Sequence, residues 1–412
     1  MYKREIDNSW NFKEANTKEY THCYHIYPAM MIPQVARTLI KDFRPSGKCE
    51  LLFDPYIGSG TSLVEASLAN MNSVGTDLNP LARLISKVKT TIYDASKLKE
   101  EFYAIQSRLF FFSYNDVKNK NFDRISNHTF WYSADSLLRL SYLSQLIDEC
   151  SENKDFFNVA LSEVVREASF TRNGEFKRFR MKEDKIKSYH PDVFGLFEEK
   201  VIRNIDGLEK YEQSVTNKTT AKICDFNSSL KIPQTAVAKK SVDMVVTSPP
   251  YGDSRTTVAY GQFSRWANEW FTFEHAQNLD RILMGGSKCD RELFKTETIV
   301  NELGKIKETD IKRYCEVASF LNDYWASILN VAETVREGGV VCYVVGNRNV
   351  KGVQIPLDYF TAETFERCGF HHITTIVREI PNKRMPSKTS PTNVSGAKVD
   401  TMSNEYMVIL RK

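Results

Sequence analysis

Short apolar runs alternate along the chain with longer stretches in which apolar residues recur at helical spacing. The runs are too short for helices and predict buried strands at residues 50–54, 73–77, 221–225, 242–246, 340–345, 373–377 and 406–410. Helical spacing predicts helices that begin at Pro33, Ser62 and Asn79, and further helices that include residues 137–147, 156–165, 201–208, 314–337 and 360–365. Because strands and helices alternate, we expect an α/β fold with a doubly wound sheet.

The same pattern divides the chain into three parts. Residues 1–94 contain a polar N-terminal arm (residues 1–20) and the first half of the sheet, and residues 219–412 contain the second half. Between them, residues 95–218 are mostly helical, which indicates an insertion. Residues 252–312 show weak periodicity, so we expect a second insertion or a mobile loop there.

Composition limits the class of protein. The chain has 412 residues, of which 42% are hydrophobic and 26% charged, as in ordinary soluble globular proteins. Its net charge of +4 does not by itself indicate a nucleic-acid partner. No signal peptide or membrane-length apolar run occurs, so we expect no membrane contact.

The cysteine pattern argues against disulfides and metal binding. Eight cysteines are scattered without a Cys-x-x-Cys pair, which favours reduced thiols in a cytoplasmic protein. His22, Cys23 and His25 are the only tight group of such side chains, and no second group with zinc spacing accompanies them. We therefore expect no metal.

A glycine turn follows the first predicted strand. Residues 54–61 contain Gly58 and Gly60 and lead into a helix, as in the first half of a nucleotide-binding βαβ unit. Leu63 takes the place of a third glycine and no Gly-Lys follows, which favours a nucleoside ligand over a dinucleotide or ATP. Asp77 ends the next strand about twenty residues later, where an acid can bind ribose hydroxyls. The alternative is a packing turn without a ligand.

A second turn follows the predicted strand 242–246. Its residues, Thr247 to Tyr251, include two prolines that can neither donate to a sheet nor continue a helix. The turn presents a hydroxyl, carbonyl oxygens and an aromatic ring, which could hold a flat base that carries an exocyclic amine. Both turns leave the carboxyl ends of strands, so we expect them to open onto one crevice. The alternative is a strand-ending loop with incidental prolines.

Basic and aromatic residues are interleaved in two places. Within residues 169–182 three phenylalanines accompany the basic residues, and Gly174 indicates an exposed turn. Residues 252–312 add further basic and aromatic side chains. This composition favours contact with phosphates and bases, whereas the alternative is a solvated loop with its phenylalanines packed inward. The candidate DNA-binding residues are Arg172, Lys177, Arg178, Arg180, Arg255 and Arg265.

Both turns resemble motifs of one enzyme family. Residues 53–61, Phe-Asp-Pro-Tyr-Ile-Gly-Ser-Gly-Thr, resemble the S-adenosylmethionine-binding motif of DNA methyltransferases that methylate amino groups. Residues 247–251, Thr-Ser-Pro-Pro-Tyr, are similar to their catalytic motif in the form usual for N4-cytosine enzymes; N6-adenine enzymes usually carry Asp or Asn before the prolines. Residues 25–29 resemble the family's N-terminal cofactor motif. The resemblance covers residues 20–90 and 220–412 and implies a Rossmann-like, mostly parallel sheet with an antiparallel terminal strand.

The resemblance also implies the roles of single residues. It implies that S-adenosylmethionine is bound by Tyr27, Pro28, Asp54, Pro55, Gly58, Ser59, Gly60, Thr61, Asp77, Leu78, Asp225 and Phe226. It implies that a cytosine flipped from double-stranded DNA is held by Ser248, Pro249, Pro250 and Tyr251. Its amine would donate to the Ser248 hydroxyl and the Pro249 carbonyl, and its ring would stack on Tyr251. A restriction–modification system, with a cognate restriction endonuclease, is the implied setting.

Several alternatives stay open. The single side chain before the prolines is thin ground for choosing N4-cytosine over N6-adenine, and related sheets with Pro-Pro-Tyr turns act on RNA bases. A non-enzymatic nucleic-acid-binding protein is disfavoured by the intact motifs. C5-cytosine methylation needs a cysteine nucleophile, and no cysteine here follows a proline. Target recognition is expected in residues 95–218, in residues 252–312, or in both.

Overall fold

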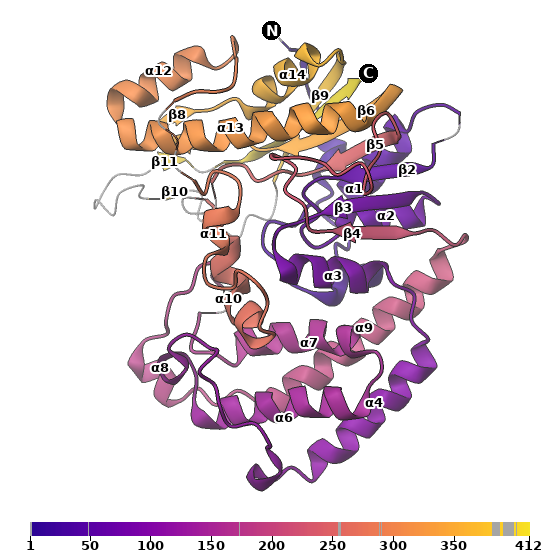
Figure 1. The fold of residues 1–412 in the computed structure, drawn as a ribbon, viewed down its shortest axis with the longest axis vertical. Helices are drawn as coiled ribbons and strands as arrows, with labels where there is room; N and C mark the ends of the chain where they lie inside the picture. Colours follow the sequence, from indigo (N-terminus) through magenta and orange to yellow (C-terminus); the bar gives the residue numbers. More distant parts are fainter. Residues whose placement is uncertain are drawn as a thin grey trace.

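The computed structural model describes residues 2–47, 49–172, 174–253, 257–287, 289, 291–380, 388–389, 399–400 and 402–412. An eight-stranded sheet with its helices forms one half of the molecule, and the helices of the predicted insertion form the other half (Figure 1). No helix in the described part of the chain is long and apolar enough to cross a membrane.

The central sheet is parallel except for one strand. Its strands lie in the order β1 (Arg4–Ile6), β9 (His371–Glu379), β12 (Asn404–Arg411), β6 (Val335–Val345), β5 (Val242–Thr247), β2 (Leu51–Asp54), β3 (Asn72–Thr76) and β4 (Ala221–Cys224). β12 is antiparallel to both of its neighbours, and the other neighbouring strands are parallel. The predicted fold class, including the antiparallel terminal strand, is therefore confirmed.

Side chains alternate between the two faces of this sheet, as the period of two in a strand requires. Leu52 and Met244 pack with α1 (Pro33–Phe43) and α2 (Thr61–Leu68) on one face. Phe53 and Val245 pack on the other face, in the core that contains α13 (Ile311–Thr334) and α14 (Leu357–Arg367). Because both faces are covered, β5 is buried along its whole length, and its residues are apolar except Asp243 and Thr247.

The insertion has a second hydrophobic core. Its main helices are α4 (Ala95–Phe110), α6 (Ala134–Cys150), α7 (Lys154–Glu167) and α9 (Val193–Ser214). Their apolar faces pack together with residues of α3 (Pro80–Thr90) and α10 (Tyr260–Trp270). The insertion is thus joined to the sheet half through helices that flank the predicted site.

The remaining elements are short. They are the 3-10 helices Asn8–Asn11, Tyr20–Tyr24 and Tyr114–Asp116, the helices α5 (His128–Trp131), α8 (Glu183–Lys187), α11 (Leu279–Ile282) and α12 (Val300–Thr309), and the paired strands β7 (Asn349–Val350) with β8 (Val353–Gln354) and β10 (Lys388–Thr389) with β11 (Val399–Asp400).

Two predictions about elements were wrong, and a third was wrong in one of its two alternatives. The polar arm contains β1, which extends the sheet beside β9. The described part of segment 252–312 contains α10, α11 and α12, and α10 buries Phe263, Trp266 and Trp270. The mobile-loop alternative for this segment is therefore wrong, whereas the insertion stays a prediction. The helix predicted to reach residue 337 ends at Thr334, and β6 begins at Val335, which pairs with Val242 of β5. The two glycines that follow pair with Lys412: Gly338 donates to the Lys412 carbonyl, and Lys412 donates to the Gly339 carbonyl.

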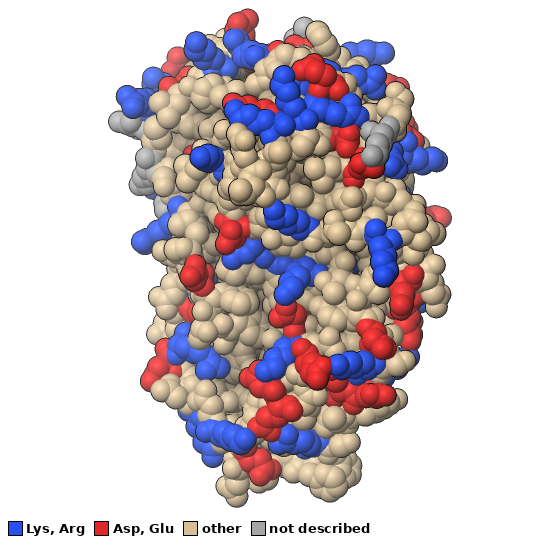
Figure 2. Space-filling view, turned by 45° about the vertical axis from the view of Figure 1, so that its right-hand side comes forward, with Lys and Arg blue, Asp and Glu red and all other residues tan. Residues whose placement is uncertain are grey.

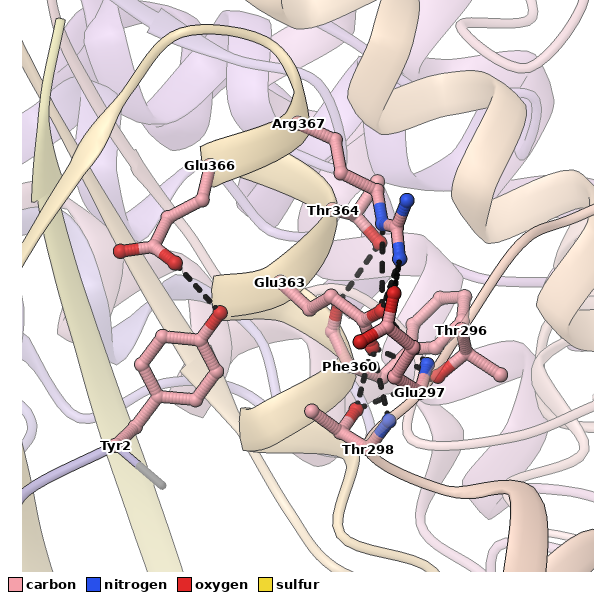
Figure 3. Close-up of polar contacts among 9 residues, drawn as sticks. All are labelled: Tyr2, Thr296, Glu297, Thr298, Phe360, Glu363, Thr364, Glu366 and Arg367. Carbon is pink, nitrogen blue, oxygen red and sulfur yellow. Dashed lines mark hydrogen bonds and ion pairs between the residues drawn. The ribbon is translucent and has the colours of Figure 1, made fainter.

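Helix α14 holds two distant segments through side chains on its surface (Figure 3). Glu366 accepts a hydrogen bond of 2.7 Å from the Tyr2 hydroxyl, beside β1. Glu363 accepts from the hydroxyls of Thr296 and Thr298 and pairs with Arg367, which fixes the segment before α12. These contacts fix both segments on the side of the sheet that α14 covers.

Strand β1 is attached by a bidentate ion pair. Arg4 donates to both carboxylate oxygens of Asp358, at 2.7 and 2.9 Å, and Asp358 is fully buried. We expect Arg4→Ala to lower the free energy of unfolding by about 2 kcal/mol, because the buried carboxylate then keeps only neutral donors such as Asn347. Urea denaturation measures this loss. The exposed neighbour Lys3→Ala is the control, and equal stability of both variants would contradict the role of β1.

Candidate functional site

A cavity opens at the carboxyl ends of β2, β3 and β5. It contains about 950 Å³ of space, part of which is open solvent. The predicted site residues that line it are Tyr27, Pro28, Asp54, Pro55, Gly58, Ser59, Thr61, Asp77, Leu78, Phe226, Ser248 and Pro250. The glycine turn and the Pro-Pro turn therefore do open onto one crevice.

The glycine turn is shaped by backbone that side chains would disturb. Gly58 and Gly60 have φ angles of +48° and +79°, in the left-handed region that glycine tolerates. A Cβ on Gly60 would lie 3.0 Å from the Cα of Ser86 in α3, so this glycine also permits close helix packing. Gly60 precedes α2 and does not itself line the cavity.

Asp54 joins the two turns. Its carboxylate accepts from the Tyr56 N–H at 2.9 Å, from the Ser62 hydroxyl at the start of α2, and from the Thr247 hydroxyl at the end of β5. Burial raises the pKa of Asp54 to about 6, although these three donors favour the ionised form. One buried carboxyl group thus holds the glycine turn and the Pro-Pro turn in fixed positions.

Asp77 presents an acid to the cavity. Its oxygens accept from the N–H groups of Gly58, at 3.0 Å, and Asn79, at 2.8 Å. Burial raises the pKa of Asp77 to about 6, and the two N–H donors oppose that rise. A carboxylate has about four acceptor positions, so acceptor capacity remains for a ligand in the cavity.

Sequence reasoning missed two residues that build one wall of the cavity. Asn79, fully buried, donates to the Tyr27 hydroxyl at 2.8 Å and to the Ser264 hydroxyl of α10 at 2.7 Å. Tyr260 lines the cavity and stacks on Tyr27 with a centroid separation of 6.0 Å. Asn79 looked like an ordinary helix cap before a proline, and only its burial shows the second role.

The Pro-Pro turn points its side chains in different directions. Ser248 and Pro250 line the cavity, whereas Pro249 and Tyr251 do not. The Tyr251 hydroxyl lies 3.1 Å from the Ser248 hydroxyl and donates to Glu405 at 3.1 Å. Asp225 is exposed and also lies outside the lining, while Phe226 beside it lines the cavity. Tyr251 and Asp225 are therefore not among the lining residues, and their contacts with a ligand stay predictions.

The predicted DNA-binding residues are dispersed. Arg178 and Arg265 line a second hollow together with Arg281 and the amide side chains of Gln262 and Gln277. In Figure 2, lysine and arginine side chains lie across the waist of one face, between the sheet half and the helical half.

The other candidates have different surroundings. Arg180 donates to the Phe130 carbonyl at 3.0 Å and pairs with Glu183, which indicates a role within the loop. Arg172 is exposed, Lys177 is half-buried, and Arg255 lies outside the described residues. Among the described residues no group of three or more metal-ligating side chains occurs.

Comparison with known proteins gives one relative of full length. No known family model matches the chain. The chain is 39% identical to the type II methyltransferase M.MvaI of Kocuria varians over 440 aligned residues, which cover 100% of this chain and 96% of that protein. It is 23% identical over 382 residues to the type II methyltransferase M.BsoBI of Geobacillus stearothermophilus, covering 85% of this chain and 71% of that protein.

Solved structures match only distantly. The rRNA methyltransferase aviRa from Streptomyces viridochromogenes has a TM-score of 0.34 and 9% identity, over 93% of this chain and 88% of that chain. The putative DNA modification methylase TTHA0409 from Thermus thermophilus, complexed with S-adenosyl-L-methionine, has a TM-score of 0.22 and 19% identity, over 45% and 53%. At these scores the matches carry no argument about function.

The Asp54 link can be tested with an isosteric change. Thr247→Val removes one donor to the buried carboxylate, so we expect the free energy of unfolding to fall by about 1–2 kcal/mol at pH 8. The loss should be smaller at pH 5, because Asp54, with a pKa of about 6, is then mostly protonated and depends less on donors. Denaturant titrations at both pH values measure this. Thr309→Val, an exposed position on α12, is the control, and equal losses at both pH values would contradict the link.

Proposed function

Because this chain belongs to the type II methyltransferases, we propose that it transfers a methyl group from S-adenosylmethionine to the N4 amine of a cytosine flipped out of duplex DNA. One observation carries the proposal. Asp77, suited to bind a ribose, and Ser248, suited to accept from an amine, line the same cavity. The Asp54 carboxyl group ties together the turns that hold them.

The residues present fit S-adenosylmethionine. Asp77 has free acceptor capacity for the ribose hydroxyls, and the half-buried ring of Phe226 offers an apolar contact for the adenine. Tyr27, Pro28 and Gly58 line the same cavity, and they are the proposed contacts of the methionine end. Asp225 is the proposed partner of the adenine amine, which requires its exposed side chain to turn toward the ligand.

The chain's own contribution to the reaction is positioning. The bound cofactor supplies an activated methyl group on a sulfonium. The Ser248 hydroxyl and the Pro249 carbonyl would accept hydrogen bonds from the cytosine amine and direct its nitrogen toward that methyl group. Among the described residues no backbone N–H outside the regular elements donates to the Pro249 carbonyl. No strong base is needed first, since the amine can lose its proton after the transfer.

The hollow lined by Arg178, Arg265 and Arg281 is the proposed path of the DNA. Residues that are neighbours in sequence line the two: Tyr260, Leu283 and Met284 line the cavity, whereas Gln262 and Arg281 line the hollow. Arg178 lies flat against Trp266, 4.7 Å from the ring centroid, so its position is well defined. Guanidinium and amide groups bind phosphates and base edges, which suits DNA next to the flipped base. Arg265 already pairs with Glu269, so we assign it to shaping this surface.

The product identifies the reaction. After incubation with duplex DNA and S-adenosylmethionine carrying a labelled methyl group, we expect nucleoside mass spectrometry to find N4-methylcytosine. Parallel incubations with RNA are the control for substrate class. N6-methyladenine as the sole product, or methylation of RNA alone, would overturn the proposal. A cognate restriction endonuclease is the proposed partner.

The ribose assignment has a pH signature. Ribose hydroxyls donate to a carboxylate better than to a carboxylic acid, and the pKa of Asp77 is about 6. We therefore expect cofactor affinity to fall up to about tenfold between pH 8 and pH 5. The Asp77→Asn variant should bind the cofactor weakly, and its cofactor affinity should depend much less on pH, although Asp54 still titrates in the variant. Titration calorimetry measures the cofactor affinity of the wild type and of the variant at each pH. A cofactor affinity that Asp77→Asn leaves unchanged would contradict the assignment of Asp77 to the ribose.

A further inference from the structure

The Ser248 hydroxyl is the first member of a chain of hydrogen bonds that leads away from the cavity. Ser248 Oγ and Tyr251 Oη are 3.1 Å apart, and Tyr251 Oη lies 3.1 Å from Glu405 Oε1. Glu405 Oε2 accepts from Arg378 Nε at 2.8 Å, and Arg378 donates onward to the Trp10 carbonyl at 3.1 Å. These hydrogen bonds link the Pro-Pro turn to β12, β9 and the N-terminal segment.

The sheet topology explains why these residues meet. Glu405 and Arg378 are direct partners in the antiparallel ladder of β12 and β9. Since β12 runs against its neighbours, its amino-terminal end lies at the edge where the parallel strands have their carboxyl ends. The one reversed strand therefore delivers Glu405 to the edge of the sheet that carries the cavity.

The donor and the acceptor in each of these hydrogen bonds can be assigned. A carboxylate paired with a guanidinium is ionised and can only accept, so Tyr251 donates its proton to Glu405. Burial, followed by the charge of Glu405, raises the pKa of Tyr251 far above its usual range, which keeps that proton on the phenol. Tyr251 has no second proton, so Ser248 must be the donor in its contact with Tyr251. The lone pairs of Ser248 Oγ remain free.

From this geometry we propose that Glu405 is a positioning residue that, through Tyr251, holds the Ser248 hydroxyl as a hydrogen-bond acceptor toward the cavity. The proposal rests on the proposed function, because an acceptor there matches the N–H donors of an exocyclic amine. A serine free to rotate would present its own proton part of the time and repel those donors. Glu405 therefore acts on the reaction without touching the substrate.

Packing around Tyr251 supports a fixed phenol. A Cβ on Gly346, just after β6, would lie 2.6 Å from Tyr251 Cδ2 and 2.0 Å from the sulfur of Met402. Only the absence of a side chain there lets the ring of Tyr251 take this place. Arg378 is 4% exposed, so the far end of the chain is buried as well.

Single-turnover methyl transfer tests the proposal. We expect Glu405→Gln and Tyr251→Phe each to lower the rate about ten- to a hundredfold, with cofactor and DNA affinities within about twofold of the wild-type values. In a Ser248→Ala background, Glu405→Gln should cause no further loss, because no hydroxyl remains to orient. A purely structural Glu405 would lower the rate in both backgrounds, and that result would overturn the proposal.

A matched pair elsewhere in the molecule is the control. Tyr2 donates to Glu366 at 2.7 Å on the exposed surface of α14, the same kind of contact far along the sheet from the cavity (Figure 3). Tyr2→Phe and Glu366→Gln should leave the transfer rate unchanged. An equal loss of rate in these variants would overturn a specific role for Glu405.

A readout without turnover separates this proposal from the proposed function. In protein with carbon-13 at the Cζ of tyrosine, Glu405→Gln should shift the Tyr251 resonance, and Glu366→Gln should shift that of Tyr2 only. A shifted Tyr251 resonance together with no methylated product from any nucleic acid would refute the function and keep the hydrogen-bond chain. An unshifted Tyr251 resonance would refute the chain whatever the activity.

Discussion

The site depends on one buried carboxyl group. Asp54 ends β2, yet its oxygens are shared by the start of its own turn, the first residues of α2 and the end of β5. A buried carboxyl group is costly unless donors surround it, so those three segments are held where their donors reach it. The glycine turn and the Pro-Pro turn are otherwise about 190 residues apart in sequence. Their fixed separation is what the proposed transfer of a methyl group to an amine requires.

Two other polar contacts extend this arrangement outward. Asn79 connects the Tyr27 wall to Ser264 of α10, and α10 packs in the core of the helical insertion. On the opposite side, Tyr251 connects the Pro-Pro turn to β12. The helical insertion and the edge strands of the sheet are thereby connected to the lining of the cavity through these hydrogen bonds. Changes far from the cavity can alter its geometry by these routes.

The pattern of apolar residues predicted the elements whose formation depends on their own sequence. The apolar runs around Phe53 and Val245 identified the central strands because burial on both faces leaves no polar positions. β1 was missed since three exposed residues carry no apolar signal and are held by pairing with β9 and by the Arg4–Asp358 ion pair. The start of β6 was missed because Gly338 and Gly339 resemble a helix end until the chain terminus pairs with them.

The site likewise has residues that the sequence predicted and residues that it missed. The two motifs marked the residues that lie at strand ends, and Asp77 and Ser248 do line one cavity. Motifs could not show that the Tyr251 hydroxyl contacts Glu405 or that Asn79 contacts Tyr27, because each contact joins segments that are distant in sequence. Glu405 in particular is a polar residue near the start of β12, and nothing in the sequence around it marks it out. Only the reversed direction of β12 brings it to the Pro-Pro turn.

A crystal structure with S-adenosylhomocysteine and a duplex that contains the methylated site would test the central claim most directly. The expected result has the ribose hydroxyls on Asp77 and an extruded cytosine whose amine lies about 3 Å from Ser248 Oγ and the Pro249 carbonyl oxygen, facing the sulfur. A target base that remains stacked in the duplex, an extruded adenine, or a ribose bound away from Asp77 would contradict the account.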